Sequence, residues 1–153
     1  MKKTIIVILS LVIVSIAYYL ISPLWRVIEL DEKVPSVSET QSEESQAKVP
    51  ELKVQSAFVA KAHEVQGRAM IYEQDGSSTL RFENFETVNG PNLHIYLAAD
   101  QKAQDFIDLG PIKATKGNVN YNLPASIDLE KYNQVIVFCV PFKVVFSLAD
   151  LSM

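Results

Sequence analysis

The segment QVIVFCVP, from Gln134 to Pro141, is the most strongly patterned stretch of this 153-residue chain. Gln134 to Phe138 is a nearly continuous apolar run, which is typical of a strand buried on both faces. Cys139 and Val140 extend the run as far as Pro141, where the strand must end or bend because proline cannot donate a ladder hydrogen bond. We therefore expect a core strand that carries a cysteine near its end.

Working outward from that strand, the pattern predicts short strands separated by turns. The expected strands are Arg68 to Tyr72, Thr79 to Phe82, Leu93 to Ala98, Val119 to Leu123 and Lys143 to Ser147. Turns are predicted at 75–78, 89–92 and 116–118, and the polar segment 99–107 is interpreted as a loop or one helical turn. Such spacing indicates an all-β fold, a single small β-sandwich or barrel-like domain over residues 58–153.

The N-terminal segment is interpreted as a membrane anchor over residues 1–27. The run from Thr4 to Trp25 approaches the length of a transmembrane helix. Lys2 and Lys3 precede it, which favours a cytoplasmic N-terminus and an extracytoplasmic C-terminal domain. The alternative is a signal peptide cleaved near Ser15-Ile16-Ala17, which would give a secreted protein.

Residues 28–57 are predicted to be a disordered linker. The run from Glu39 to Gln46 contains no aromatic and no branched aliphatic residue, and Pro35 and Pro50 flank it. Such a segment cannot bury enough apolar surface to offset the entropy lost on ordering.

Composition excludes several classes of function. The net charge is −4 and the pI is about 5.2, which disfavours binding to nucleic acid. A single cysteine can form neither an internal disulfide nor a zinc site built from cysteine pairs, and no metal site is predicted. The chain also lacks a glycine-rich phosphate loop, a paired-histidine zinc helix and a nucleophile elbow.

Cys139 is therefore the candidate site residue, as a redox thiol or as a soft ligand to a cofactor. The alternative is that Cys139 only fills space in the core, since free cysteine is often buried. His94 is a weaker candidate ligand, and it shares a strand face with Tyr96. A structural or exposed role for His94 stays open, as does a surface role for His63.

Several segments together resemble a known family. They are Gly67, the runs 81–85 and 89–97, Leu109-Gly110, Lys116-Gly117-Asn118, Asn120-Tyr121, Leu123-Pro124 and 135–139. In this order they resemble the DM-thirteen domain, a small extracellular module of Skeletor-like cell-surface proteins, over about Phe58 to Leu151. Asn92 departs from the family pattern, which usually has aspartate after the Gly-Pro pair.

The resemblance implies an electron-transfer role in which Cys139 matches the family's signature cysteine. That cysteine would act as a bare thiol or hold a prosthetic group such as haem, and the partner would be a redox protein at the membrane surface. Two alternatives stay open. The domain could be a non-enzymatic binding or adhesion module with a structural cysteine, or Cys139 could form an intermolecular disulfide.

Overall fold

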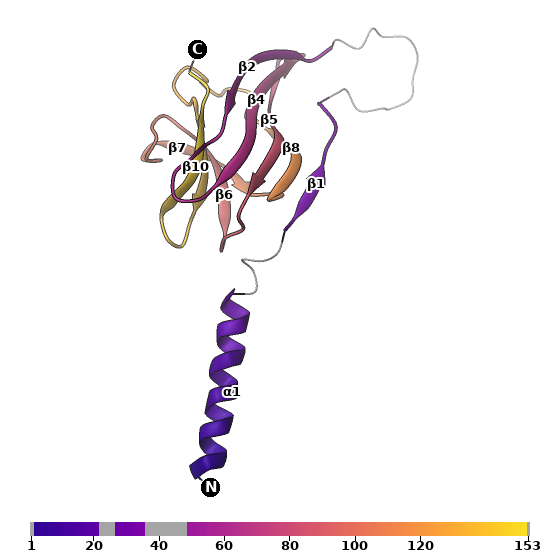
Figure 1. The fold of residues 1–153 in the computed structure, drawn as a ribbon. Helices are drawn as coiled ribbons and strands as arrows, with labels where there is room; N and C mark the ends of the chain where they lie inside the picture. The colour runs from indigo at the N-terminus through magenta and orange to yellow at the C-terminus, as the bar shows by residue number, and fades with distance from the viewer. Residues whose placement is uncertain (1, 22–26, 36–48, 153) are drawn as a thin grey trace.

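A computed structural model describes residues 2–21, 27–35 and 49–152 of the chain. One helix, α1 (Lys2–Ile21), precedes two five-stranded sheets, as Figure 1 shows. The strands are β1 (Glu29–Asp31), β2 (Glu51–Ala57), β3 (Val59–Ala60), β4 (Val65–Gln74), β5 (Ser77–Thr87), β6 (Leu93–Ala98), β7 (Phe106–Pro111), β8 (Lys116–Asn122), β9 (Gln134–Cys139) and β10 (Val144–Asp150). The predicted all-β sandwich is confirmed.

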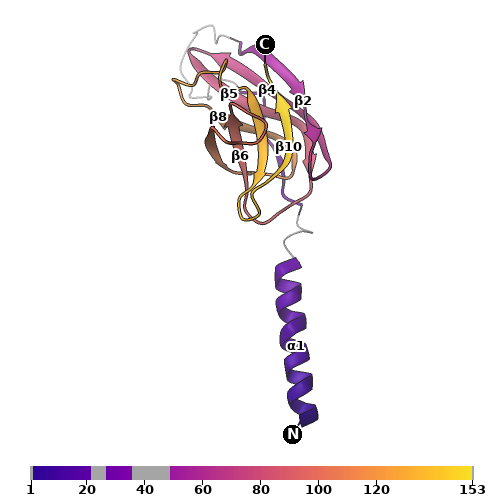
Figure 2. The same ribbon diagram turned by 90° about the vertical axis from the view of Figure 1, so that its left-hand side faces the viewer.

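The two sheets have the orders β1-β8-β5-β4-β2 and β3-β10-β9-β6-β7. We call them sheet A and sheet B, and Figure 2 shows them from a second direction. All pairs are antiparallel except β1 with β8, which is parallel. The strand predicted from the QVIVFCVP segment is β9, which lies in the middle of sheet B between β6 and β10.

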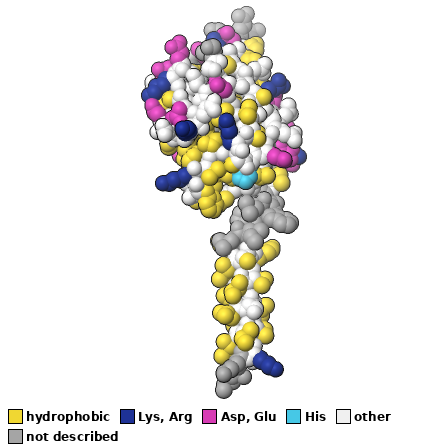
Figure 3. Space-filling view, turned by 60° about the vertical axis from the view of Figure 1, so that its left-hand side comes forward, with side chains coloured by type: hydrophobic (Ala, Val, Ile, Leu, Met, Phe, Trp, Pro, Cys, Tyr) yellow, Lys and Arg dark blue, Asp and Glu magenta, His cyan; other side chains and the backbone are white. Residues whose placement is uncertain are grey.

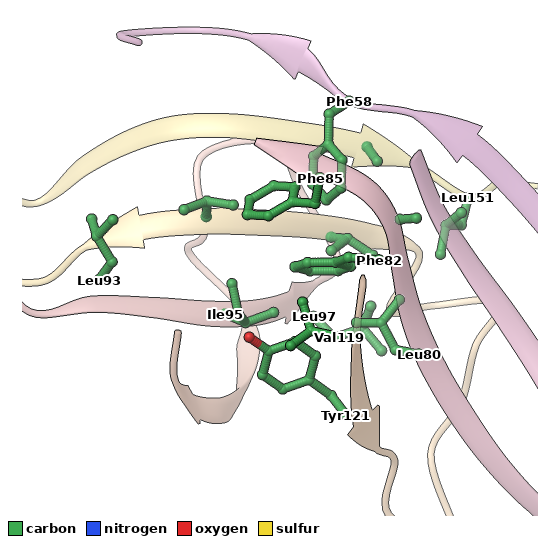
Figure 4. Packing of buried hydrophobic residues seen from close by; sticks show 14 of the residues in the cluster. Phe58, Leu80, Phe82, Phe85, Leu93, Ile95, Leu97, Val119, Tyr121 and Leu151 are labelled. Atoms are coloured by element: carbon green, nitrogen blue, oxygen red, sulfur yellow. The ribbon is translucent and has the colours of Figure 1, made fainter. Parts of the chain in front are cut away.

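The core lies between the sheets and is supplied by both of them. Sheet A contributes the rings of Phe82, Phe85 and Tyr121, and sheet B contributes the aliphatic side chains of Ile95 and Leu97, as Figure 4 shows. The ring centroids of Phe82 and Phe85 are 5.0 Å apart. Aromatic pairs at this separation each add about 0.5–1.5 kcal/mol beyond the burial of their surface.

Two sequence predictions about sheet segments were wrong. Phe106–Pro111 forms the edge strand β7, although no strand had been predicted there and its first two residues, Phe106 and Ile107, had been assigned to a loop or helical turn. Its side chains are exposed or half-buried, so the strand has no run of core residues by which it could be recognised in the sequence. Lys116-Gly117-Asn118 had been interpreted as a turn, but these residues begin β8. Gly117 has a positive φ of 114° there, which explains the turn-like composition.

The predicted linker over 28–57 differs from the structure at both ends, because Glu29–Asp31 is β1 and Glu51–Ala57 is β2. Pairing with a neighbouring strand satisfies the backbone of both segments, and Leu30 and Val54 also pack against the core. Residues 36–48, which include the whole polar run from Glu39 to Gln46, lie outside the described residues.

Arg81 holds the N-terminal strap, residues 28–33, against sheet A. The residue is 3% exposed, and its Nη1 donates to the carbonyl oxygens of Glu32 and Lys33 and to Oδ1 of Asn120, at 2.9, 3.1 and 3.0 Å. A buried guanidinium with three acceptors is a strong anchor, because hydrogen bonds from charged donors are worth more than neutral ones.

The apolar segment at the N-terminus forms α1, as predicted. In the part of the chain that the structure describes, no helix combines the length and the apolar character required to cross a membrane. The predicted transmembrane span is therefore not supported by the structure.

Candidate functional site

Cys139 is the last residue of β9 and faces the core between the sheets. Its cross-strand partners are Leu93 of β6 and Val144 of β10. The residue is 0% exposed and belongs to the main hydrophobic cluster. The expectation that Cys139 lies at the end of a core strand is confirmed, but this strand end does not bring the thiol to the surface.

One polar contact is made by the thiol. Sγ of Cys139 donates to the carbonyl oxygen of Pro91 at 3.4 Å. Pro91 and Asn92 are themselves exposed, and the carbonyl oxygen of Asn92 accepts a 3.2 Å hydrogen bond from the amide of Val140. The turn 89–92 therefore covers the thiol on one side, and its outer residues face solvent.

The predicted turn at 89–92 depends on Asn92 and Gly90 for different reasons. The positive φ falls on Asn92, at 54°, and not on Gly90. Asparagine tolerates this conformation, so the departure from the family's usual aspartate keeps a suitable residue. Gly90 is needed for space, since an added Cβ would lie 2.9 Å from Cζ of Phe146 and 3.1 Å from Cδ2 of Leu93.

His94 is next to Cys139 in the sheet, but the two side chains diverge. His94 pairs with Phe138, the residue before Cys139, and so its ring lies on the outer face of sheet B. Nδ1 of His94 is 2.9 Å from Oδ2 of Asp108 on β7. The structure thus brings the two strands together without making a shared ligand site.

The remaining polar side chains that the structure describes near the site do not form a ligand site with Cys139. The ring of His63 packs on Phe146 with centroids 4.0 Å apart. On the His94 face of sheet B, burial and the charge of Asp108 raise the pKa of Tyr96. Among residues 2–21, 27–35 and 49–152, no group of three or more histidine, cysteine, aspartate or glutamate side chains is placed to hold a metal ion.

Haem does not fit Cys139 as the structure has it. An axial thiolate must present its sulfur to the iron at the face of a large flat macrocycle. Here the sulfur is fully enclosed by core side chains and by the turn that carries Pro91, so it has no open side for a macrocycle. The chemistry open to Cys139 is that of a bare thiol.

The hydrogen bond to Pro91 is the feature of the site that the sequence analysis missed. The composition of Asn89-Gly90-Pro91-Asn92 indicated a tight turn, but it could not indicate which side chain the turn covers. The one available signal was that the turn opens β6, because a strand that pairs with β9 would bring its first residues beside the end of β9.

A scan against family models matches residues 57–151 to the model described as electron transfer DM13. The chain belongs to the DM13 family. The DM13 match begins at the end of β2 and includes all strands from β3 to β10, together with Cys139 and the turn 89–92. It does not extend to α1 or β1. No match was found among curated proteins or among solved structures.

Proposed function

We propose that this DM13 domain transfers electrons through Cys139 by thiol–disulfide exchange with a partner protein outside the cytoplasm. The family description supports electron transfer, and Cys139 is the only cysteine in the chain. The observation that carries the proposal is the position of Sγ beneath one exposed turn, where it bonds to the carbonyl oxygen of Pro91.

The reaction needs a disulfide of the partner protein as the oxidant and a free thiol of a second protein or of glutathione as the reductant. The thiolate of Cys139 attacks one sulfur of a partner disulfide, a new S–S bond forms, and the second partner sulfur leaves as a thiolate. Cys139 is oxidised to the mixed disulfide, and the departing sulfur is reduced. The free thiol then attacks the partner sulfur of the mixed disulfide. It forms a new S–S bond with that sulfur and is thereby oxidised, while the bond to Cys139 breaks and Cys139 leaves as a thiolate.

For this exchange, the turn 89–92 must open. Two hydrogen bonds join the turn to the end of β9, one from Sγ of Cys139 and one from the amide of Val140. Local opening of a surface turn costs less than global unfolding, so the thiol can be reached while the rest of the sandwich stays folded. The closed turn would protect the thiol from unspecific oxidation between exchanges.

The experiment is to incubate the folded full chain with oxidised glutathione and to follow the mixed disulfide by intact-protein mass. We expect exchange in native buffer, none in Cys139→Ser, and unchanged far-ultraviolet circular dichroism in both. Serine keeps a donor for the Pro91 carbonyl, which makes it the matched control. Exchange that appears only at denaturant concentrations that unfold the whole domain would refute the proposal.

We also propose that α1 tethers the domain to a membrane, with the N-terminus in the cytoplasm. Large apolar side chains along α1, among them Ile5, Leu9 and Ile16, are exposed. Membrane fractions washed with alkaline carbonate would retain a tethered chain, whereas N-terminal sequencing of a soluble extracellular form would reveal cleavage after a signal peptide. Recovery of uncleaved chain in the soluble fraction would contradict both forms of export.

A second candidate function is favoured by the complete burial of Cys139. In that case, Cys139 is a core residue, and the domain is a binding or adhesion module. Cys139→Ala would then keep every activity of the protein and change only its stability. Glutathione exchange in the native state would exclude this candidate as the sole function.

A further inference from the structure

A second feature lies on the outer face of sheet B, on the side of β9 opposite to Cys139. A groove of about 580 Å³ is lined by Gln101, Lys102, Ala103, Phe138, Val140, Lys143 and Val145. This volume is within the range of sites for small organic ligands, about 300–1,000 Å³. Figure 3, which views the domain from this side, shows hydrophobic side chains gathered at the lower end with basic side chains beside them.

Phe138, which lines the groove, is the last ring in a column of stacked rings that crosses three strands. Phe106 of β7 stacks on Tyr96 of β6 with centroids 4.1 Å apart and planes 13° apart, and Tyr96 stacks on Phe138 of β9 at 4.9 Å and 26°. On the next strand, β10, the register partner of Phe138 is Val145. The column therefore stops at Phe138, because the position where a fourth ring would stack is taken by the smaller side chain of Val145, which lines the groove.

Two cations flank this position without a partner. In the described part of the chain, the ammonium groups of Lys102 and Lys143 make no ion pair and no hydrogen bond. Asp100 is the acidic residue next to Lys102, but its carboxylate accepts the backbone amides of Lys102, Gln104 and Asp105. The Asp100 carboxylate is thus bound within its own loop. Although the protein has a net charge of −4, two lysines without an ion pair lie beside the groove.

The backbone is strained at the same place. Five described non-glycine residues have a positive φ, and three of them are Asp or Asn, which tolerate it. The other two are Ala103, at 54°, and Lys143, at 52°, and both line the groove. Residues held in unfavourable conformations gather at ligand sites, so this observation points to the groove independently of its charge and its shape.

We propose that this groove binds a small planar aromatic anion, whose ring system stacks on Phe138 and whose acidic groups pair with Lys102 and Lys143. Ring stacking and cationic contacts together favour such a ligand over either a neutral ring or a simple inorganic anion. The site goes beyond the proposed thiol exchange and does not depend on it, because the side chain of Cys139 faces the other side of the sheet.

The test uses anthraquinone-2,6-disulfonate titrated calorimetrically into the full chain. We expect one saturable site, and we expect Lys102→Gln/Lys143→Asn to weaken it about tenfold or more, the loss of two charge-assisted contacts. Asparagine is chosen at position 143 because it tolerates the positive φ. Phe138→Leu should also weaken binding, since it removes the stacking surface but keeps an apolar floor.

Matched controls separate the site from general electrostatics. Lys53→Gln/Lys116→Gln removes the same charge from sheet A and should leave the affinity within about twofold. Cys139→Ser should bind as the wild type does, even if thiol exchange is lost. Sulfate and naphthalene-2,6-diol should not saturate at the same concentrations.

Three results would overturn the proposal. The first is unchanged affinity in Lys102→Gln/Lys143→Asn, and the second is an equal loss in the sheet A control. The third is the absence of saturable binding of the disulfonate. If the last result were joined by lysine-dependent binding to phosphatidylserine vesicles, the occupant would be a membrane surface and not a small aromatic anion.

Discussion

The thiol of Cys139 and the carbonyl oxygen of Pro91 are joined by a 3.4 Å hydrogen bond, although 48 residues separate them in the chain. This contact ties the end of a central strand to the turn that covers it. The reactivity of Cys139 should therefore report on the opening of that turn.

We expect iodoacetamide to alkylate Cys139 slowly in the native domain, and Gly90→Ala to increase the rate about tenfold. The new methyl group would lie 2.9 Å from the ring of Phe146, and relief of that clash should loosen the turn. Overpacking of this kind costs about 1–3 kcal/mol, which corresponds to roughly a tenfold change or more in an opening equilibrium. The rate is measured by intact-protein mass against time.

Gly76→Ala is the control for global stability, because Gly76 has a positive φ but no neighbour within 4 Å of an added Cβ. It should lower stability without selective acceleration of alkylation. If wild-type Cys139 reacted as fast as a free thiol, the buried position would not persist in solution.

Gly117→Ala should release β1 from sheet A. An added Cβ at Gly117 would lie 2.0 Å from the carbonyl oxygen of Leu30, which no rearrangement of side chains can relieve. We expect a loss of about 2–4 kcal/mol in the free energy of unfolding and faster tryptic cleavage after Lys33. Both are measured on the full chain, by chemical denaturation and limited proteolysis.

Gly110→Ala separates this clash from backbone strain. Gly110 has a similar φ of 100° but nothing within 4 Å of an added Cβ, so it should cost only about 1 kcal/mol. Equal losses in the two variants would show that the contact between β1 and β8 contributes nothing to stability.

Arg81→Met should destabilise the domain by about 2–4 kcal/mol, because three acceptors lose their charged donor. Arg68→Met is the comparison. Arg68 is more exposed and pairs with Glu83 at 3.0 Å, and a surface ion pair is worth about 1 kcal/mol or less. Denaturation midpoints measure both, and a smaller effect of Arg81→Met than of Arg68→Met would contradict the anchoring role.

Stability should fall at alkaline pH through Tyr121. Burial is the main cause that raises the pKa of this hydroxyl from 10.0 to about 12. The folded state therefore holds the proton more tightly than the unfolded state does, so the contribution is complete below pH 10 and is lost as the pH rises toward 12. The loss is about 2–3 kcal/mol.

Tyr121→Phe should flatten the decline in stability between pH 10 and 12, which denaturant titrations at each pH can measure. At neutral pH, the variant should lose about 1 kcal/mol, because the hydroxyl accepts a 3.0 Å hydrogen bond from the amide of Lys113. The raised pKa of Tyr96 would leave a residual slope. An unchanged alkaline profile in Tyr121→Phe would show that another group controls it.

The strands that could be predicted from sequence are those whose own pattern of apolar and polar residues matches their buried and exposed faces. Alternation in Leu93–Ala98 and the apolar run of β9 identified two central strands and the two faces of β6. Strands β1 and β7 were missed because their ordering comes from other parts of the chain. Glu29–Asp31 is short and mostly exposed, and Gly117 and Arg81, far away in sequence, hold it in place.

The site was predictable to the same extent. Cys139 could be selected as the sole thiol, but its burial depends on the turn 89–92, and its separation from His94 depends on strand register. A shift of register by one residue exchanges the faces of a strand, so local pattern alone cannot decide whether two candidates meet. The stacked column that ends at Phe138 likewise joins three strands from separate parts of the chain.

The pairing of β1 with β8 also changes how far the domain can travel from α1. If the chain joined the fold only at β2, about thirty residues would separate the helix from the sandwich, a fully extended reach of roughly 100 Å. When β1 is paired with β8, only the chain from Ile21 to Ile28 connects the helix to the sandwich. The distance between the end of α1 and the domain is then at most roughly 25 Å. Asp31 at the end of β1 and Glu51 at the start of β2 are then both fixed to sheet A, so the number of residues between them no longer sets the distance between the domain and α1.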